Sequence, residues 1–134
     1  MEKDFVAFDI AKKLKEKGFQ IDEPYAMYNE LGVFHKLFSS AGYYDYYSYN
    51  DFDERDCIAP TIAQALKWLR EEKNFHIEII SAAYGYVYVI SRTPDFGGTD
   101  IRSSEYKGPN EGGAWDEWED CVTNAIEYVI DNSI

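Results

Sequence analysis

Three stretches of the chain alternate apolar and polar residues with the 3.6-residue period of an amphipathic helix. They are residues 4–19, 59–74 and 114–134. The predicted buried stripes are Val6, Ala7, Ile10, Ala11 and Leu14 in the first stretch, Ile62, Ala65, Leu66 and Leu69 in the second, and Trp118, Cys121, Val122, Ala125, Ile126, Val129 and Ile130 in the third. We therefore expect three helices that each bury one face, with Leu66 and Ile126 fully buried.

The ends of these helices carry residues that are typical of helix termini. Thr61 with Gln64, and Asp116 with Glu119, have the spacing of a capping box, in which each side chain satisfies a backbone amide. Gly18 follows the first helix, where glycine favours termination. These signals predict where the helices begin and end.

Two further segments have the alternation and the turn residues of β-hairpins. The expected strands are residues 25–28 and 33–38, joined by a turn at 29–32, and residues 75–79 and 86–90, joined by a turn at 82–85. The last of these strands places Val87 and Val89 on one face and Tyr86 and Tyr88 on the other. Residues 101–106 form a candidate edge strand.

The predicted element order is α-β-β-(β)-α-β-β-(β)-α. Strands that are joined by tight turns must run antiparallel. The three helices need an apolar surface for their stripes, and one face of a sheet provides it. We therefore predict an α+β protein with two layers: a single antiparallel sheet, made of two hairpins and candidate edge strands, with three helices packed on it. Residues 1–134 are expected to form a single domain.

A resemblance accompanies this pattern. The segment IAPTIAQALKWLREEKNFHIEI, the tyrosine-rich hairpin after it and the acidic segment WDEWEDCVTNAIEYVI resemble a group of small uncharacterised α+β proteins of gut Bacteroides-type bacteria. The first helix, ending AKKLKEKGF, fits the same pattern. The matching residues are helix caps and core positions. The resemblance therefore implies a bacterial cytoplasmic protein, of the kind encoded by mobile elements or phages, and it implies no activity.

The charge of the chain narrows the range of partners. With 13 Lys and Arg against 25 Asp and Glu, the net charge is −12. Such an acidic surface repels phosphate backbones and anionic lipid. We expect no direct binding to nucleic acid and none to membranes. The expected partner is another protein, and a basic one is the least penalised; the oligomeric state is left open.

The cysteines and the apolar runs predict the compartment. No apolar run approaches the roughly 18 residues that span a bilayer. Cys57 falls in a polar segment and is expected to be exposed, whereas Cys121 falls on a buried stripe, so the two are not expected to pair. The pattern favours a cytoplasmic protein with free thiols. A mature chain from which a leader had been removed would look the same.

Few residues have the spacing of a catalytic or metal site. His35 and His76 are far apart in the sequence. The segment DFDERD at 51–56 opens like a calcium loop, but it has arginine in place of a third ligand and aspartate in place of the required glycine. A catalytic Cys57 would need a histidine folded beside it. We therefore predict no catalytic residues, no metal site and no cofactor.

The stretch GYYDYYSYNDFDERDC at 42–57 is the least ordinary part of the sequence. Its tyrosines fit neither strict alternation nor a helical stripe. They could belong to a strand or ordered loop that covers the sheet, or to a patch that binds a protein, since tyrosine gains contact area at low entropic cost. The predicted protein-binding residues are Tyr43, Tyr44, Tyr46, Tyr47, Tyr49, Asp51, Asp53, Tyr86 and Tyr88.

Acidic residues are concentrated in two short stretches. Residues 45–56 hold five acids and one base, and residues 111–120 hold five acids and no base, which together give −9 of the −12. We therefore expect a small acidic cytoplasmic protein that is a non-catalytic binding or accessory protein and uses a tyrosine-rich acidic surface. Two alternatives are a phage or mobile-element inhibitor that mimics nucleic acid, and an enzyme whose site the sequence does not reveal.

Overall fold

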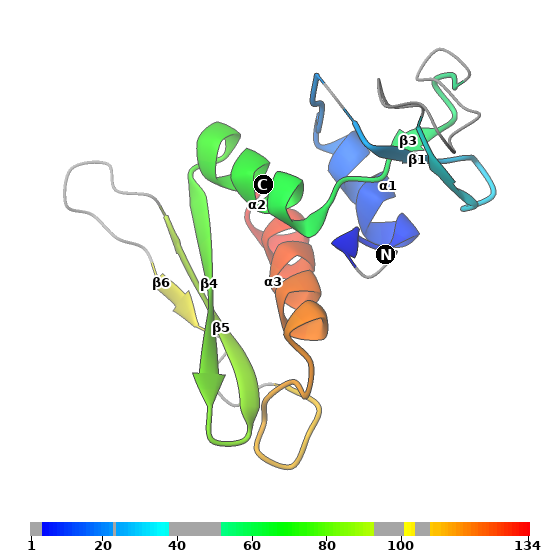
Figure 1. Ribbon diagram of the computed structural model, residues 1–134. Coiled ribbons are helices and arrows are strands. Elements are labelled where there is room, and N and C mark those ends of the chain that lie inside the picture. Colours follow the sequence, from blue (N-terminus) through cyan, green and yellow to red (C-terminus); the bar gives the residue numbers. More distant parts are fainter. Residues whose placement is uncertain (1–3, 23, 38–51, 93–100, 104–107) are drawn as a thin grey trace. The chain divides into compact units, whose positions relative to one another are not determined.

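The structure, a computed structural model, describes residues 4–22, 24–37, 52–92, 101–103 and 108–134. The chain divides into two compact units, of which the first ends at Ala63 and the second begins at Gln64. Each unit contains an antiparallel sheet and a helix that contacts it, so the α+β class is confirmed (Figure 1). The single-domain expectation for residues 1–134 stays a prediction.

Nine helices and strands lie within the described ranges. In chain order they are α1 (Phe8–Glu16), β1 (Ala26–Tyr28), β2 (Phe34–Lys36), β3 (Cys57–Ile58), α2 (Ile62–Glu72), β4 (Phe75–Ala82), β5 (Gly85–Arg92), β6 (Ile101–Ser103) and α3 (Trp118–Asn132). None of the helices in these ranges is long and apolar enough to cross a membrane.

The first unit is built on a sheet with the strand order β2-β1-β3. Both pairings of β1 are antiparallel, and Met27 lies opposite His35 on one side and Ile58 on the other. Helix α1 contacts β3. The hydroxyl of Tyr28 donates a 2.7 Å hydrogen bond to the carbonyl of Val6, which ties the strand to the segment that precedes the helix.

Helix α1 ends as the sequence predicts. The N–H of Phe19 donates to the carbonyl of Leu14 at 2.9 Å, which closes a Schellman-type turn. This turn requires a left-handed backbone at Gly18, where φ is 91°. Glycine adopts that conformation without the steric strain that a Cβ atom would bring.

The second unit is built on the sheet β4-β5-β6. Strands β4 and β5 form a long hairpin in which Ala82 lies opposite Gly85, as the predicted turn requires. Strand β6 pairs with β5 and confirms that the 101–106 segment contains an edge strand. Helix α3 contacts both β4 and β5.

The prediction of one continuous sheet was wrong. Two three-stranded sheets form, and each hairpin takes its third strand from the segment that follows it. Strand β3 at Cys57–Ile58 completes the first sheet before α2 begins, at the place where the predicted order has a candidate strand. Because each hairpin has a nearby partner strand, neither needs to pair with the other.

The buried face of α2 differs from the predicted stripe. Ile62, Ala65 and Leu69 are buried as expected. Trp68 is also buried, whereas Leu66 is only half-buried, so the prediction for Leu66 was wrong. Burying the indole ring, the largest side chain of the helix, turns the buried face toward Trp68 and away from Leu66.

The core stripe of α3 is confirmed except at its first residue. The members that are buried are Cys121, Val122, Ala125, Ile126, Val129 and Ile130. Trp118 is 40% exposed, contrary to the prediction. The predicted cap was also wrong: Glu117 occupies the N-cap position without a side-chain hydrogen bond to the helix, and Asp116 accepts a hydrogen bond from Asn110 instead.

Candidate functional site

Most of the predicted binding residues lie outside the described residues. These are Tyr43, Tyr44, Tyr46, Tyr47, Tyr49 and Asp51. Of the predicted set, the structure describes Asp53 in the first unit and Tyr86 and Tyr88 in the second. The protein-binding role of the tyrosines at 43–49 therefore stays a prediction.

Asp53 organises a tight turn of the first unit. One of its carboxylate oxygens accepts a 2.8 Å hydrogen bond from the N–H of Arg55, and the other forms a 2.8 Å ion pair with the Arg55 guanidinium. The carboxylate of Asp56 in turn accepts a 2.9 Å hydrogen bond from the backbone N–H of Asp53. These hydrogen bonds to Arg55 lower the pKa of Asp53, and Asp53 in turn raises the pKa of Arg55.

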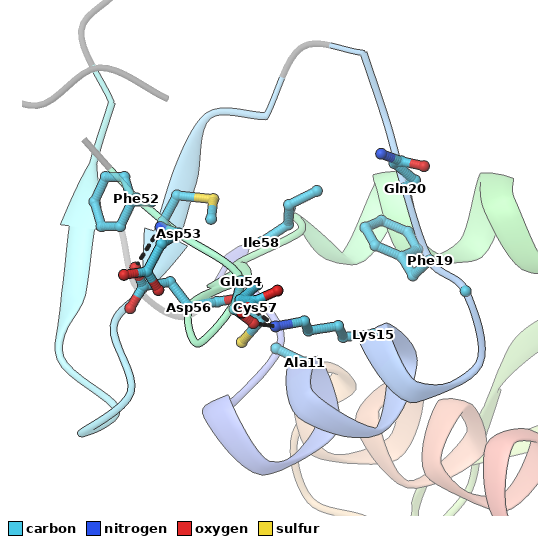
Figure 2. A pocket seen from close by; sticks show the side chains of 12 residues that line it. Ala11, Lys15, Phe19, Gln20, Phe52, Asp53, Glu54, Asp56, Cys57 and Ile58 are labelled. Carbon is cyan, nitrogen blue, oxygen red and sulfur yellow. Dashed lines mark hydrogen bonds between the residues drawn. The ribbon is translucent and has the colours of Figure 1, made fainter. Parts of the chain in front are cut away.

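Lys15 of α1 bonds to the backbone of this turn. Its ammonium group donates to the carbonyl of Glu54 and, at 2.7 Å, to the carbonyl of Asp56 (Figure 2). Two carbonyl oxygens of the DFDERD segment, at Glu54 and Asp56, are thus bound by a lysine of α1. Within the described ranges, no three His, Cys, Asp or Glu side chains gather as metal ligands do.

Two pockets flank Lys15 and Cys57 in the first unit. The larger, about 450 Å³ in volume, is lined on one side by Phe19 and on another by the turn at 53–56 (Figure 2). The smaller, about 320 Å³, is lined by Lys12 and Arg55 among others. Both are lined by charged residues, among them Lys15, and by Cys57.

Cys57 does not have the environment of a nucleophile. It lies on β3 and is 4% exposed, so the expectation of an exposed loop cysteine was wrong. Burial is the largest influence on its thiol and raises its pKa, while the nearby charges of Lys15 and Lys12 act weakly in the opposite direction. A raised pKa reduces the thiolate fraction at neutral pH, and the thiolate is the reactive form.

We expect both thiols to be free and protected in the native protein. Cys121 is fully buried, and burial raises its pKa to about 11. At neutral pH, a thiol reagent should label the native chain at least about a hundredfold more slowly than the unfolded chain, because labelling requires opening of the core. Denatured but unreduced protein should titrate with two thiols. A titration that finds none would contradict this assignment.

The tyrosines of β5 lie on the covered face of the second sheet. Tyr88 is 7% exposed, and its ring packs against Trp115, with 5.4 Å between centroids, and against Tyr128 of α3. The prediction that Tyr88 extends an exposed patch was therefore wrong. The register explains the error: Ile79 lies opposite Tyr88, and residues directly opposite in a sheet share a face. Tyr86 is half-buried on the same face.

Asn110 is the centre of a loop that packs on the tip of the β4–β5 hairpin. Its side-chain oxygen accepts hydrogen bonds from the N–H groups of Gly112 and Ala114, both at 2.9 Å. Its side-chain nitrogen donates to the carbonyl of Tyr84 at 2.8 Å and to the carboxylate of Asp116 at 2.9 Å. All four hydrogen-bonding positions of the amide are used. One side chain thus fixes the hairpin tip, the loop and the residues before α3.

Gly112 lets the loop approach the hairpin closely. A Cβ atom at this position would lie 2.2 Å from the Cβ atom of Tyr84, a distance that no real contact allows. The backbone of Trp115 completes the junction by exchanging two hydrogen bonds with Tyr86, at 2.8 and 2.9 Å. The loop is therefore held by backbone contacts as well as by Asn110.

Aromatic rings and carboxylates are exposed at the hairpin tip, in the loop and at the start of α3. Tyr84 is 65% exposed and Trp118 is 40% exposed. We call these two rings, with the carboxylates of residues 111–120, the acidic aromatic surface. Its acidic members are Glu111, Asp116, Glu117, Glu119 and Asp120.

Sequence reasoning found the charge of this surface and missed its rings. Residues 111–120 were recognised as acidic, but Trp118 was assigned to the core and Tyr84 to an ordinary turn. A usable signal was present in GPNEGGAW, because an asparagine two residues before a Gly-Gly pair is typical of a turn closed by the asparagine side chain.

Comparisons with known proteins add no relative. No protein-family model matches the chain, and no curated protein or solved structure is significantly similar to it. The resemblance to proteins of gut Bacteroides-type bacteria stays a prediction.

Proposed function

We propose that the protein is a non-catalytic binding or accessory protein that engages a basic protein partner through the acidic aromatic surface. The observation that carries the proposal is the exposure of two rings, Tyr84 and Trp118, beside groups that Asn110 holds in place. Asn110 donates to the carbonyl of Tyr84 and to the carboxylate of Asp116, two residues before Trp118. Tryptophan and tyrosine dominate the energetic centres of protein interfaces.

The charge of the surface supports a basic partner. Residues 108–120 contain five acids and no base. Complementary charge accelerates association and selects against acidic competitors, while buried aromatic contacts supply most of the affinity. The same charge disfavours nucleic acid and anionic membranes as ligands.

The pre-formed loop lowers the entropic cost of binding. A surface that is already ordered in the free protein loses little conformational freedom in a complex. The amide of Asn110 bonds to groups on both sides of the loop and so orders it before any partner arrives.

Affinity capture with matched variants tests the proposal. The double variant Tyr84→Ser/Trp118→Ser is the bait that should lose its partner from a lysate of the organism that encodes the chain. Tyr25→Ser is the matched control, because Tyr25 is a similarly exposed ring, 61%, in the first unit. We expect capture at low salt by wild type and by Tyr25→Ser, and loss of the same protein with the double variant.

A second bait separates this surface from the tyrosine run. If Tyr46→Ser/Tyr47→Ser abolishes capture and Tyr84→Ser/Trp118→Ser does not, then the partner binds the segment at 43–49 and the acidic aromatic surface is not the site. Competition with duplex DNA completes the test. A captured DNA-binding protein that DNA displaces would identify the chain as a mimic of nucleic acid.

A further inference from the structure

The second sheet has an open edge within the described part of the chain. β4 lies at one end of the order β4-β5-β6 and extends over eight residues. The unpaired N–H and C=O groups of an edge strand bind other strands, and natural edges carry proline, lysine or a bulge that prevents this. The segment Phe75–Ala82 has no proline or lysine, and its register with β5 is unbroken.

The hydrogen bonds of β5 show which residues of β4 face this edge. Tyr86 exchanges both of its backbone hydrogen bonds with Trp115, so its N–H and C=O point away from β4. These directions alternate along an antiparallel strand, so the odd-numbered residues of β5 bond to β4. Their partners on β4 are even-numbered. The backbone groups that face the open edge are therefore those of Phe75, Ile77, Ile79 and Ser81.

The sequence of the edge is complementary to itself in an antiparallel arrangement. β4 begins Phe-His-Ile-Glu-Ile. When Ile77 faces Ile77 of a second copy, Phe75 faces Ile79 and His76 faces Glu78 on each side of the centre. The odd-numbered pairs then exchange backbone hydrogen bonds. His76 and Glu78, both exposed, meet on the opposite face, where the imidazole N–H can donate to the carboxylate.

Neighbouring registers lack this complementarity. A slip in one direction places Glu78 against Glu78 of the second copy, and a slip in the other places His76 against His76. Carboxylates that lie directly opposite each other destabilise a pair of strands. Two opposed imidazoles lack the carboxylate acceptor that the His76–Glu78 pair provides. The paired segment also has a natural end, because Asn74 leaves the extended conformation at a φ of 64°.

We propose that β4 is the interface of a homodimer, in which two β4 strands pair antiparallel about Ile77 and join the two sheets of the second units. The half-buried Ile77 and Ile79 gain apolar neighbours in this arrangement. The interface consists of backbone hydrogen bonds, with one hydrogen-bonded pair of His76 and Glu78 on each side of its centre. It does not depend on the acidic aromatic surface.

Sedimentation velocity over a range of concentrations tests the proposal with a charge swap. His76→Glu places carboxylates opposite one another, and Glu78→His places imidazoles opposite one another. Each single variant should dimerise about tenfold more weakly than wild type at low salt. The double variant His76→Glu/Glu78→His restores the pairs with their members exchanged and should return dimerisation close to the wild-type value.

The matched control is Glu72→His, which makes the same change at an exposed residue at the end of α2 and should leave dimerisation unchanged. Circular dichroism spectra should show the same fold for all variants, because each substitution is at an exposed side chain. A wild-type chain that remains monomeric at high concentration would overturn the proposal. So would a dimer that responds equally to the two single variants and to the swap.

Discussion

Replacing Ile126 by alanine should lower the free energy of unfolding by roughly 2–5 kcal/mol, the range for large-to-small substitutions in a closed core. Ile126 is completely buried on the face of α3 that includes Val122 and Val129. Helix α3 contacts both long strands of the second sheet, so a cavity here removes contacts from the centre of that unit. Urea unfolding followed by circular dichroism measures the loss.

A control on the same helix separates packing from helix propensity. Asn124 is exposed on α3, and its side-chain amide donates to the carbonyl of Asp120 one turn earlier. Asn124→Ala should change stability by less than about 0.5 kcal/mol, as is usual for surface substitutions. A loss of under about 0.5 kcal/mol at Ile126 as well would show that α3 does not form the core of the second unit.

Replacing Asn110 by alanine should destabilise the chain by about 2 kcal/mol, since the net worth of each lost hydrogen bond is near 1 kcal/mol and water replaces part of it. The substitution removes the acceptor for the amides of Gly112 and Ala114 and the donor to Tyr84 and Asp116. We also expect faster hydrogen exchange at the two amides, which nuclear magnetic resonance can measure residue by residue.

Asn110→Asp separates the role of the Asn110 side chain as an acceptor from its role as a donor. An aspartate keeps an oxygen for the amides of Gly112 and Ala114, but it places a second carboxylate beside Asp116 and loses the donor to Tyr84. Exchange at the two amides should therefore stay slow while stability still falls. If both variants exchange like wild type, the loop is held by its backbone contacts alone and the role assigned to Asn110 is wrong.

The elements with strong local patterns could be predicted from the sequence. The stripe of α3, the turn at Gly18 and the long hairpin all have signals that span a few residues. The α+β fold class could be predicted from these local patterns. The division into two sheets could not be predicted, because β3 has only two residues and its pairing depends on a strand about thirty positions earlier.

The errors at single residues have a common cause. Leu66, Tyr88 and Trp118 were assigned by hydrophobic periodicity alone. The core instead takes Trp68 in preference to Leu66, and it takes Tyr88, while Trp118 is exposed. For Tyr88 the information was present, since a turn at 82–85 fixes which residues of the two strands share a face. For Trp118 it was absent, because no local cap marks the start of α3: Glu117 makes no side-chain cap and Asp116 bonds to Asn110.

The candidate site was also predictable only in part. Its charge at 111–120 is visible in the composition, but its shape depends on contacts between the loop and the hairpin tip, which are more than twenty residues apart in the sequence. The carboxylate of Asp53, a predicted binding residue, forms an ion pair with Arg55 and accepts a hydrogen bond from its backbone N–H, so it is engaged within the turn itself.

The most direct measurement is the binding kinetics of the captured partner on immobilised wild type, Trp118→Ser and Tyr25→Ser at two salt concentrations. The acidic aromatic surface predicts that higher salt slows association with wild type. It also predicts that Trp118→Ser raises the dissociation constant at least about tenfold, mainly through faster dissociation, while Tyr25→Ser binds like wild type. Equal affinity for Trp118→Ser and wild type, with association that is insensitive to salt, would contradict a protein-binding role for this surface.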